Sequence, residues 1–109
     1  MTWREEALRH VEAAAPLEAC GLVVEIEGSV LFWPCRNLCD EPGLFALDPE
    51  DYLKAEEAGT VMAVVHSHVS DNLEASDLDQ ENCDLTGVPW HIVSTVTDEW
   101  ITIRPAEVD

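Results

Sequence analysis

The spacing of hydrophobic and polar positions changes between helical and strand periodicity along the chain, and these changes predict the order of its elements. In the first segment, apolar residues fall on one stripe at helical spacing: Ala7, Leu8, Val11, Ala14 and Ala15. Thr2 followed by Glu5 forms a capping box. We therefore expect an amphipathic helix that begins there and that Pro16 ends.

Two strands joined by a tight turn are predicted next. Residues 19–26 are mostly apolar and β-branched, which is typical of a strand, and residues 29–35 provide a partner. The turn is predicted at Glu27-Gly28, because glycine readily takes the positive φ that such turns require. The segment 36–43 is polar and is expected to be an exposed loop.

The middle of the chain predicts a helix between two strands. Residues 45–47 have the pattern of a short strand. Asp48 as N-cap and Pro49 in the first turn then begin a helix that Gly59 ends. Residues 61–65 form a nearly continuous apolar run, as expected for a strand buried on both faces, and it leads directly into two histidines.

The last third predicts one helix and a pair of strands. The helix covers 76–86 with Gly87 as its stop, and strands over 90–96 and 100–104 follow around a turn. Because 109 residues bury one core but not two, we expect a single domain over 1–109. Its predicted fold is α/β or α+β, a mixed, partly antiparallel sheet flanked by two to three helices.

The charge of the chain is one-sided and argues against some partners. Five basic residues stand against 23 acidic ones, which gives a formal net charge of −18. Such a field repels nucleic acid and anionic membranes, so neither is expected as a partner. The first residues lack the basic and then apolar build of a signal peptide, and no apolar run approaches the ~18 residues of a membrane span. We therefore expect a cytoplasmic protein.

The four cysteines are expected to be reduced thiols: Cys20, Cys35, Cys39 and Cys83. They are even in number, but no export signal accompanies them, so a disulfide framework is not expected. Cys35 and Cys39 have a C-x3-C spacing, which without a second pair is only a weak zinc pattern. We interpret these cysteines as structural.

The clearest candidate chemistry lies in H-S-H at 66–68, followed after seven residues by S-D-L-D at 76–79. Histidines two apart on an extended strand point to the same side, so both imidazoles can reach one ion. A carboxylate from the first turn of the following helix can provide a third ligand. Two histidines and one carboxylate suit Zn²⁺ and leave its fourth tetrahedral position for water, which favours a catalytic over a closed structural site.

Hydrolysis at such a site needs two further groups. Zinc lowers the pKa of bound water from ~15.7 towards ~7, and a nearby carboxylate must take up the proton and pass it to the leaving group. The hydroxyl of Ser76 can donate to the oxyanion of a tetrahedral intermediate. A plainer explanation exists as well: Ser76 as N-cap and Asp79 at N3 form an ordinary capping box, and a histidine pair is often chance.

These motifs together resemble the signature of the JAMM (MPN+) zinc metalloproteases, which include deubiquitinating isopeptidases, at every defined position. The resemblance implies a JAMM/MPN (cytidine-deaminase-like) fold, with His66, His68 and Asp79 as zinc ligands and Ser76 as the oxyanion-stabilising serine. The run P-L-E-A-C-G at 16–21 resembles the P-x-E-x-C-G motif of the bacterial and phage branch. In that branch the glutamate is the general base, a role that falls here on Glu18.

Further segments extend the resemblance over almost the whole chain. C-R-N-L at 35–38, F-A-L-D-P-E-D-Y at 45–52 and G-V-P-W-H-I-V-S at 87–94 are similar to the JAMM domain of tail-tip assembly proteins of long-tailed phages. An NlpC/P60 cysteine peptidase domain usually follows in those proteins, which are associated with tail assembly or cell-wall peptides. The resemblance implies such a peptidase or a phage tail protein as partner, and a virion-associated location as the alternative to the cytoplasm. Because this sequence ends at Asp109, we expect a stand-alone relative, a split version or an excised piece.

One position departs from the family pattern. Val69 stands where a proline usually follows the second histidine, and its freer φ is expected to loosen the loop that borders the site. This change bears on substrate positioning more than on metal binding. The chain is also too short for the insertions with which the eukaryotic isopeptidases grip ubiquitin.

Two functions follow from the sequence. The first is a zinc-dependent metallopeptidase that hydrolyses a peptide or isopeptide bond of a peptide or protein substrate through a zinc-activated water, with Glu18 and Ser76 as catalytic residues. The alternative is a non-catalytic assembly or scaffold module with the JAMM fold. His10 and His91 are not expected to be ligands, and Cys83, one helical turn after the third predicted ligand, is expected to be a small core residue.

Overall fold

Five strands form one sheet in the order β2-β1-β3-β4-β5. β1 (Cys20–Ile26) pairs antiparallel with β2 (Ser29–Cys35) on one side and with β3 (Thr60–His68) on the other. β3 pairs in parallel with β4 (Trp90–Ser94), which in turn pairs antiparallel with β5 (Trp100–Ile103). The sheet is therefore mixed and partly antiparallel, as the sequence predicts.

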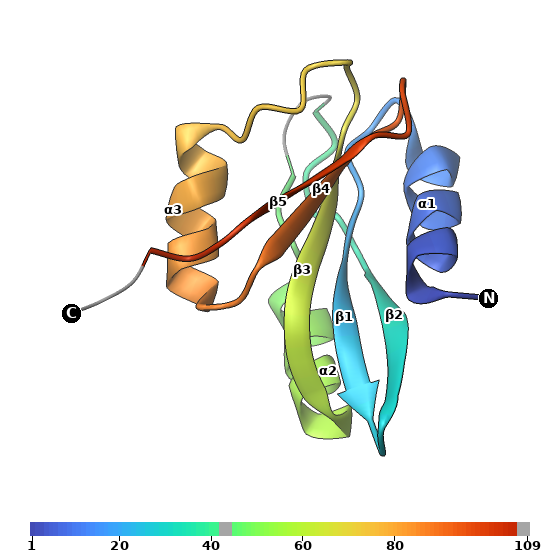
Figure 1. Ribbon diagram of the computed structural model, residues 1–109, viewed down its shortest axis with the longest axis vertical. Coiled ribbons are helices and arrows are strands. Elements are labelled where there is room, and N and C mark those ends of the chain that lie inside the picture. Colours follow the sequence, from blue (N-terminus) through green and yellow to red (C-terminus); the bar gives the residue numbers. More distant parts are fainter. Residues whose placement is uncertain (42–44, 107–109) are drawn as a thin grey trace.

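Three helices cover the sheet in this computed structural model, which describes residues 1–41 and 45–106 (Figure 1). α1 (Trp3–Ala14) packs on one face of the sheet, and α2 (Pro49–Ala58) and α3 (Asp77–Thr86) pack on the other. In the part of the chain that is described, no helix has the length and apolar character needed to cross a membrane.

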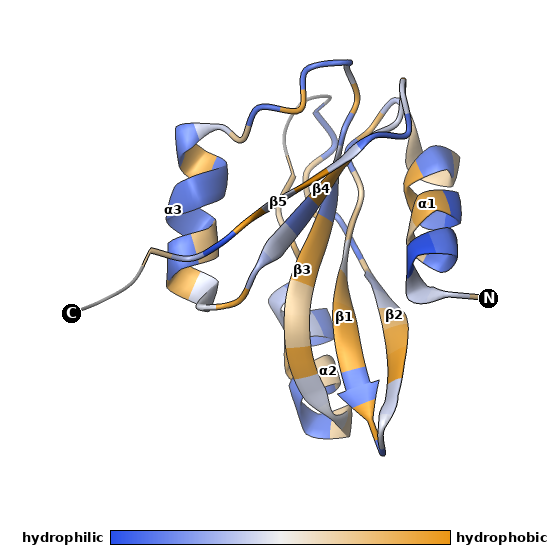
Figure 2. Ribbon diagram, viewed as in Figure 1, coloured by the Kyte–Doolittle hydropathy of each residue, from blue (hydrophilic) through white to orange (hydrophobic). Residues whose placement is uncertain are grey.

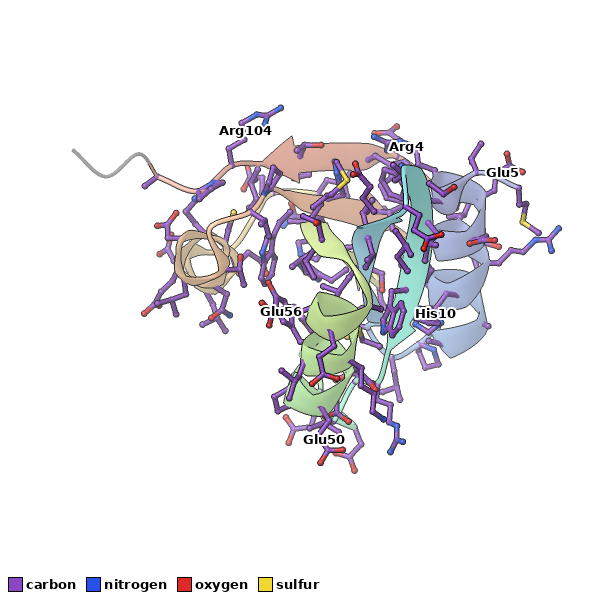
Figure 3. All side chains as sticks on the ribbon, turned by 90° about the horizontal axis from the view of Figure 1, so that it is seen from below. Arg4, Glu5, His10, Glu50, Glu56 and Arg104 are labelled. Atoms are coloured by element: carbon purple, nitrogen blue, oxygen red, sulfur yellow. The ribbon has the colours of Figure 1, made fainter. Side chains whose placement is uncertain are left out.

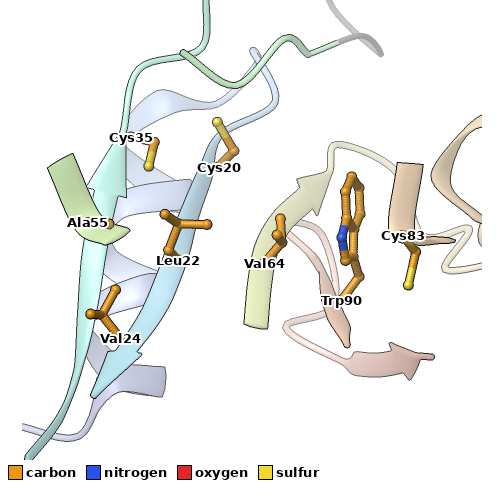
Figure 4. Packing of buried hydrophobic residues seen from close by; sticks show 8 residues of the cluster. All are labelled: Cys20, Leu22, Val24, Cys35, Ala55, Val64, Cys83 and Trp90. Atoms are coloured by element: carbon orange, nitrogen blue, oxygen red, sulfur yellow. The ribbon is translucent and has the colours of Figure 1, made fainter. Parts of the chain in front are cut away.

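Alternation along β1 explains why helices cover both faces. Val23 packs with Ala7 of α1 and Phe32 of β2, whereas its neighbours Leu22 and Val24 pack on the opposite face. That opposite face holds the larger cluster, whose buried members are Cys20, Leu22, Val24, Cys35, Ala55, Val64, Cys83 and Trp90 (Figure 4). Hydrophobic residues accordingly dominate the central strands, while the helices carry hydrophilic outer surfaces (Figure 2).

The predicted local signals define most element boundaries. The Oγ1 of Thr2 accepts a hydrogen bond from the Glu5 amide at 3.2 Å, and the carboxylate of Asp48 accepts one from the Glu50 amide at 2.9 Å. Gly87 ends α3 in the left-handed conformation with φ 71°. The turn between β1 and β2 has positive φ at both central positions, and these are the predicted residues of 27–28.

Two expectations for the strands are corrected. Residues 45–47 do not form a strand, because their pairing is limited to a single bridge between Asn37 and Leu47. The strand expected over 90–96 ends at Ser94, since the Oγ of Ser94 accepts hydrogen bonds from the amides of 96 and 97 and so begins a turn. Part of the loop expected over 36–43 lies outside the described residues.

Candidate metal centre

The connection from β3 through α3 to β4 brings the predicted ligands together. A crossover between two parallel strands starts its helix beside the end of the first strand, so the first turn of α3 lies next to the last residues of β3. His66 and His68 come from β3 and Asp79 from that first turn. One ligand atom from each side chain lies within 4.8 Å of the other two. Within the described residues this is the group of side chains that can hold a metal ion.

His66 presents an imidazole nitrogen that lacks a partner. The side chain is buried, and its Nδ1 lies 3.3 Å from the carbonyl oxygen of Ser67, to which it can donate. Its Nε2 lies 3.1 Å from Oδ1 of Asp79 but outside hydrogen-bond geometry, so it has no hydrogen-bond partner in the described part of the chain. A buried nitrogen left in this state fits a metal ligand, because a proton on Nδ1 leaves the Nε2 lone pair free.

His68 is held between two acceptors. Its Nδ1 lies 3.0 Å from the carbonyl oxygen of Asn72, and its Nε2 lies 3.2 Å from Oδ2 of Asp79. Neither oxygen can donate, so the arrangement favours the form of His68 with protons on both ring nitrogens. The hydrogen bond to Asp79 accordingly raises the pKa of His68. The carbonyl on Nδ1 orients the ring so that Nε2 faces the cluster, as backbone carbonyls commonly do for metal-binding histidines.

Asp79 has two roles that are compatible. It closes the capping box of α3, since the amide of Ser76 donates to its Oδ2 at 2.9 Å. Its two carboxylate oxygens also face the two histidines, one each. Burial by itself would raise the pKa of Asp79, but the contacts with both imidazoles outweigh burial and hold that pKa well below its usual range. The plainer capping explanation is therefore correct but does not compete with metal binding.

Glu18 lies two residues before the first residue of β1 and faces the same cluster. Its carboxyl group is largely buried, with Oε1 3.7 Å from Nδ1 of His66. Burial raises the pKa of Glu18, although the two nearby histidines oppose this effect. Its backbone is fixed on both sides: the side-chain amide of Asn37 donates to the Glu18 carbonyl at 2.7 Å, and the amide of Ala19 donates to Oγ of Ser67 at 2.9 Å.

The hydroxyl group of Ser76, at the rim of the site, can still donate a hydrogen bond. Its Oγ accepts a hydrogen bond from the Asp79 amide at 3.0 Å, and a hydroxyl that accepts in this way can still donate. The side chain is exposed and lines a cleft of about 510 Å³ together with Glu18, His68 and Asp79. The structure thus brings all five sequence-predicted site residues to one cleft or its wall.

Some residues of the site were not found from the sequence. Phe45 stacks on His66 with ring centroids 4.4 Å apart and lines the cleft. Asn72 orients His68 through its carbonyl oxygen, and Asn37 fixes the backbone of Glu18. The motif segments 35–38 and 45–52 contain two of these three residues, but nothing in the spacing assigned them a contact with the site.

The loop after β3 is held by hydrogen bonds despite the valine at position 69. Ser94 donates through its hydroxyl to the carbonyl of Ser70 at 2.6 Å. The amide of Asn72 donates to Oγ of Ser70, and the amide of Glu74 donates to the side chain of Asn72. These contacts order the loop where a proline is missing, and Val69 itself lines the cleft.

The other candidate groups lie away from the ligand cluster. Nε2 of His10 lies 3.1 Å from the carbonyl of Cys20, and Nδ1 of His91 lies 2.9 Å from the hydroxyl of Thr102. Cys83 belongs to the core, with its thiol 3.4 Å from the carbonyl of Val88. All four cysteines are free. None of these groups joins the three ligands within the described part of the chain.

The chain thus has a βαβ unit inside a mixed sheet, with two histidines on the first strand of the unit and an aspartate on its helix. Residues 2–105 match the family of prokaryotic homologues of the JAB domain, and the chain belongs to this family. The resemblance to JAMM (MPN+) proteins drawn from the motifs is thereby confirmed.

Individual relatives agree with this assignment. The chain is 46% identical over 99 residues to the tail tip assembly protein K of Escherichia phage N15. This alignment covers 90% of this chain and 41% of the phage protein. It therefore spans about two fifths of the length of this relative. A protein from Desulfitobacterium hafniense, known from its solution structure, has a TM-score of 0.72 at 25% identity, covering 92% of this chain and 76% of that one. A JAB1/MPN domain protein from Archaeoglobus fulgidus has the same fold, with a TM-score of 0.61 at 19% identity over 93% of this chain and 81% of that one.

Proposed function

We propose that this chain is a zinc-dependent peptidase that hydrolyses a peptide or isopeptide bond. The observation that carries the proposal is the position of the buried Glu18 carboxyl group beside the histidine and aspartate cluster, within one cleft. A purely structural metal site needs no carboxyl group of raised pKa at its side. The unpartnered Nε2 of His66 supports metal binding, because a buried polar atom otherwise carries a cost of about 1–3 kcal/mol.

The roles of the residues follow from their positions. His66, His68 and Asp79 would hold the ion, and zinc, when bound, supplies a Lewis acid and a water of pKa ~7. Glu18 accepts a proton and delivers it to the leaving nitrogen, a task that suits a carboxyl group whose pKa is raised towards neutrality. Ser76 donates its free hydroxyl proton to the oxygen of the carbonyl under attack.

The biological setting is proposed from the phage relative. Because that relative is a tail tip assembly protein, we infer that the substrate is a peptide or protein met during tail assembly or in the cell wall. A phage tail protein or an NlpC/P60 peptidase is the proposed partner, and nucleic acid and membranes are not. The proposed location is the cytoplasm during assembly, or the virion.

A second function, a non-catalytic assembly module, has one observation in its favour. The name of the phage relative describes assembly and no reaction. In this case the metal would only fasten α3 to the end of β3, and the carboxyl group of Glu18 would have no chemical task. The two functions differ in what removal of that carboxylate does.

The deciding experiment compares Glu18→Gln with the wild type. Zinc content is measured by elemental mass spectrometry and hydrolysis with peptide and isopeptide panels. We expect unchanged zinc and turnover lower by about 10²–10⁴-fold, the range for loss of a general base. Glu25→Gln is the matched control, because Glu25 lies on β1 but is exposed. A Glu18→Gln protein as active as the wild type contradicts the proposed role.

The metal site is tested independently with His68→Ala. Wild-type protein purified without chelator is expected to hold one zinc per chain, and the variant to lose it, since removal of a direct ligand exceeds the ~10–100-fold loss caused by outer partners. His91→Ala serves as control, because His91 lies away from the cluster. Absence of metal from the wild type leaves the assembly module as the better explanation.

A further inference from the structure

A second groove adjoins the metal cleft and is not used by the mechanism. It has a volume of about 680 Å³ and is lined by side chains of both α2 and α3, over a floor formed by β3 and β4. Phe45 and Asn82 line both this groove and the metal cleft. Because Phe45 stacks directly on His66, the groove begins at the ring that covers a metal ligand. The groove therefore lies next to the place where a substrate would reach the metal centre.

The walls of this groove are aromatic and aliphatic. Phe45, Tyr52 and Trp90 line it, with the rings of Phe45 and Trp90 5.9 Å apart. Trp90 is buried, and its indole Nε1 is satisfied by a hydrogen bond to Thr86, so the part of its ring that lines the groove is apolar. Leu53 at the edge of the groove is 55% exposed and adds apolar surface there. These surfaces suit a long aliphatic or aromatic group.

One carboxylate stands at the edge of these apolar walls. Glu56 lines the groove and lies on the side of α2 that faces α3 (Figure 3). The pKa of Tyr52 is raised by burial and further by the charge of Glu56, which is consistent with a carboxylate close to the phenol. No lysine or arginine lines either cleft among the described residues, so the negative charge of Glu56 has no cation beside it there.

We propose that this groove is a specificity subsite that binds a basic side chain, lysine or arginine, flanking the scissile bond of the substrate. The aliphatic stem packs against the aromatic walls and the cation meets Glu56. Lysine and arginine combine a long apolar stem with a terminal charge, and cations are attracted to aromatic faces as well as to carboxylates. The inference rests on the proposed peptidase function and names the substrate class of that site.

The test measures binding rather than turnover. The zinc-loaded Glu18→Gln protein is titrated calorimetrically with acetylated, amidated pentapeptides of alanine that carry lysine, arginine, leucine or glutamate at the centre. We expect the lysine and arginine peptides to bind about tenfold more tightly than the leucine and glutamate peptides. Glu56→Gln should weaken binding of the basic peptides by about two- to fivefold, as for an exposed ion pair, and Glu56→Lys by more. Glu57→Gln, on the same helix but outside the groove, should change nothing.

The outcomes separate this inference from the proposed function. Equal binding of all four peptides, a preference for leucine, no binding of any peptide, or basic peptides that bind Glu56→Lys as tightly as wild type would each overturn the subsite. Hydrolysis by the wild type without preference for a basic residue would overturn it too, while the peptidase function stands. Conversely, basic peptides that bind the zinc-free His68→Ala protein and lose affinity in Glu56→Lys support the subsite even if no hydrolysis is found.

Discussion

The side-chain amide of Asn37 donates a 2.7 Å hydrogen bond to the backbone carbonyl of Glu18. The same side chain accepts, through its Oδ1, hydrogen bonds from the amides of Cys39 and Ala46, each at 2.9 Å. Asn37 thus connects Glu18, the proposed base, with Ala46, the residue next to Phe45, whose ring stacks on His66. A single amide side chain therefore positions two walls of the metal cleft.

Asn37→Ala is expected to damage both stability and turnover while leaving zinc bound. Three backbone groups lose their partner, and we expect a loss of about 1–3 kcal/mol in the free energy of unfolding, measured by chemical denaturation. Turnover should fall mainly in kcat, because Asn37 fixes the backbone of the proposed base and contacts none of the three ligands. Asn37→Asp keeps the acceptor oxygen but not the donor, so it should retain the hydrogen bonds from the Cys39 and Ala46 amides and lose only the one to Glu18. Unchanged kcat in both variants would show that the position of Glu18 does not depend on Asn37.

Ser76 combines two roles that substitution can separate. As the N-cap of α3 it accepts the Asp79 amide, and as the proposed oxyanion donor it needs its hydroxyl proton. Ser76→Gly is expected to cost only a few tenths of a kcal/mol and Ser76→Ala about 1 kcal/mol, because glycine is tolerated at an N-cap. Both should lower kcat by about 10²–10³-fold if the hydroxyl stabilises the oxyanion. A kcat that tracks the stability of the two variants instead would assign Ser76 to capping alone.

Zinc binding should release a proton from His68. Its pKa in the metal-free fold is raised above 6.5 by Asp79, so below that pH the ring is an imidazolium and must lose the Nε2 proton to bind an ion. Apparent zinc affinity is therefore expected to rise with pH. The stability that this raised pKa gives the metal-free protein has the opposite dependence: it is fully present below about 6.5, the value in the unfolded chain, and is lost as pH rises through the folded-state value.

Calorimetry measures this proton directly. Zinc is titrated into metal-free protein at about pH 6, in two buffers that differ in ionisation enthalpy. The difference in observed heat gives the number of protons released, which we expect to be near one at that pH and to decrease at higher pH. His91→Ala should release the same number. Identical heats in both buffers would mean that no proton is released and that His68 is already neutral at this pH. That result would contradict the protonated form that its two acceptors favour.

The sequence predicted those features that depend on neighbours along the chain. The caps at Thr2, Asp48 and Ser76 and the hairpin turn at 27–28 are local, and the structure has them all. The period of two along a strand was enough to place His66 and His68 on one side. The family motif then selected Asp79 from the two aspartates of the helix start.

The features that the sequence did not predict depend on contacts between distant segments. The stacking of Phe45 on His66 and the bond from Asn37 to Glu18 join parts of the chain that share no periodicity. For the same reason the strand expected over 45–47 was wrong: its apolar pattern is explained by packing on the ligand and the core, and its backbone forms only one bridge. The second groove likewise exists only because α2 and α3 pack on the same face of the sheet.

Gly21 gives a prediction that joins the motif at 16–21 to packing. A Cβ added at Gly21 would lie 2.3 Å from the ring of Phe32 and 2.8 Å from the backbone oxygen of Trp33, both on β2. The glycine is thus required by the close approach of Phe32 across the strand pair rather than by chemistry at the cleft. Gly21→Ala is expected to lower the free energy of unfolding by about 1–3 kcal/mol through overpacking, measured by chemical denaturation.

A double-mutant cycle with Phe32→Leu tests this explanation of Gly21. The smaller side chain relieves the clash, so the cost of Gly21→Ala should shrink by about 0.5 kcal/mol or more in the Phe32→Leu background, the coupling expected of residues in contact. The backbone oxygen of Trp33 remains, so the relief should be partial. Zinc content should be the same in all four proteins, because neither residue contacts a ligand. Additive costs would mean that Phe32 does not impose the glycine, and that the contact with the backbone of β2 does.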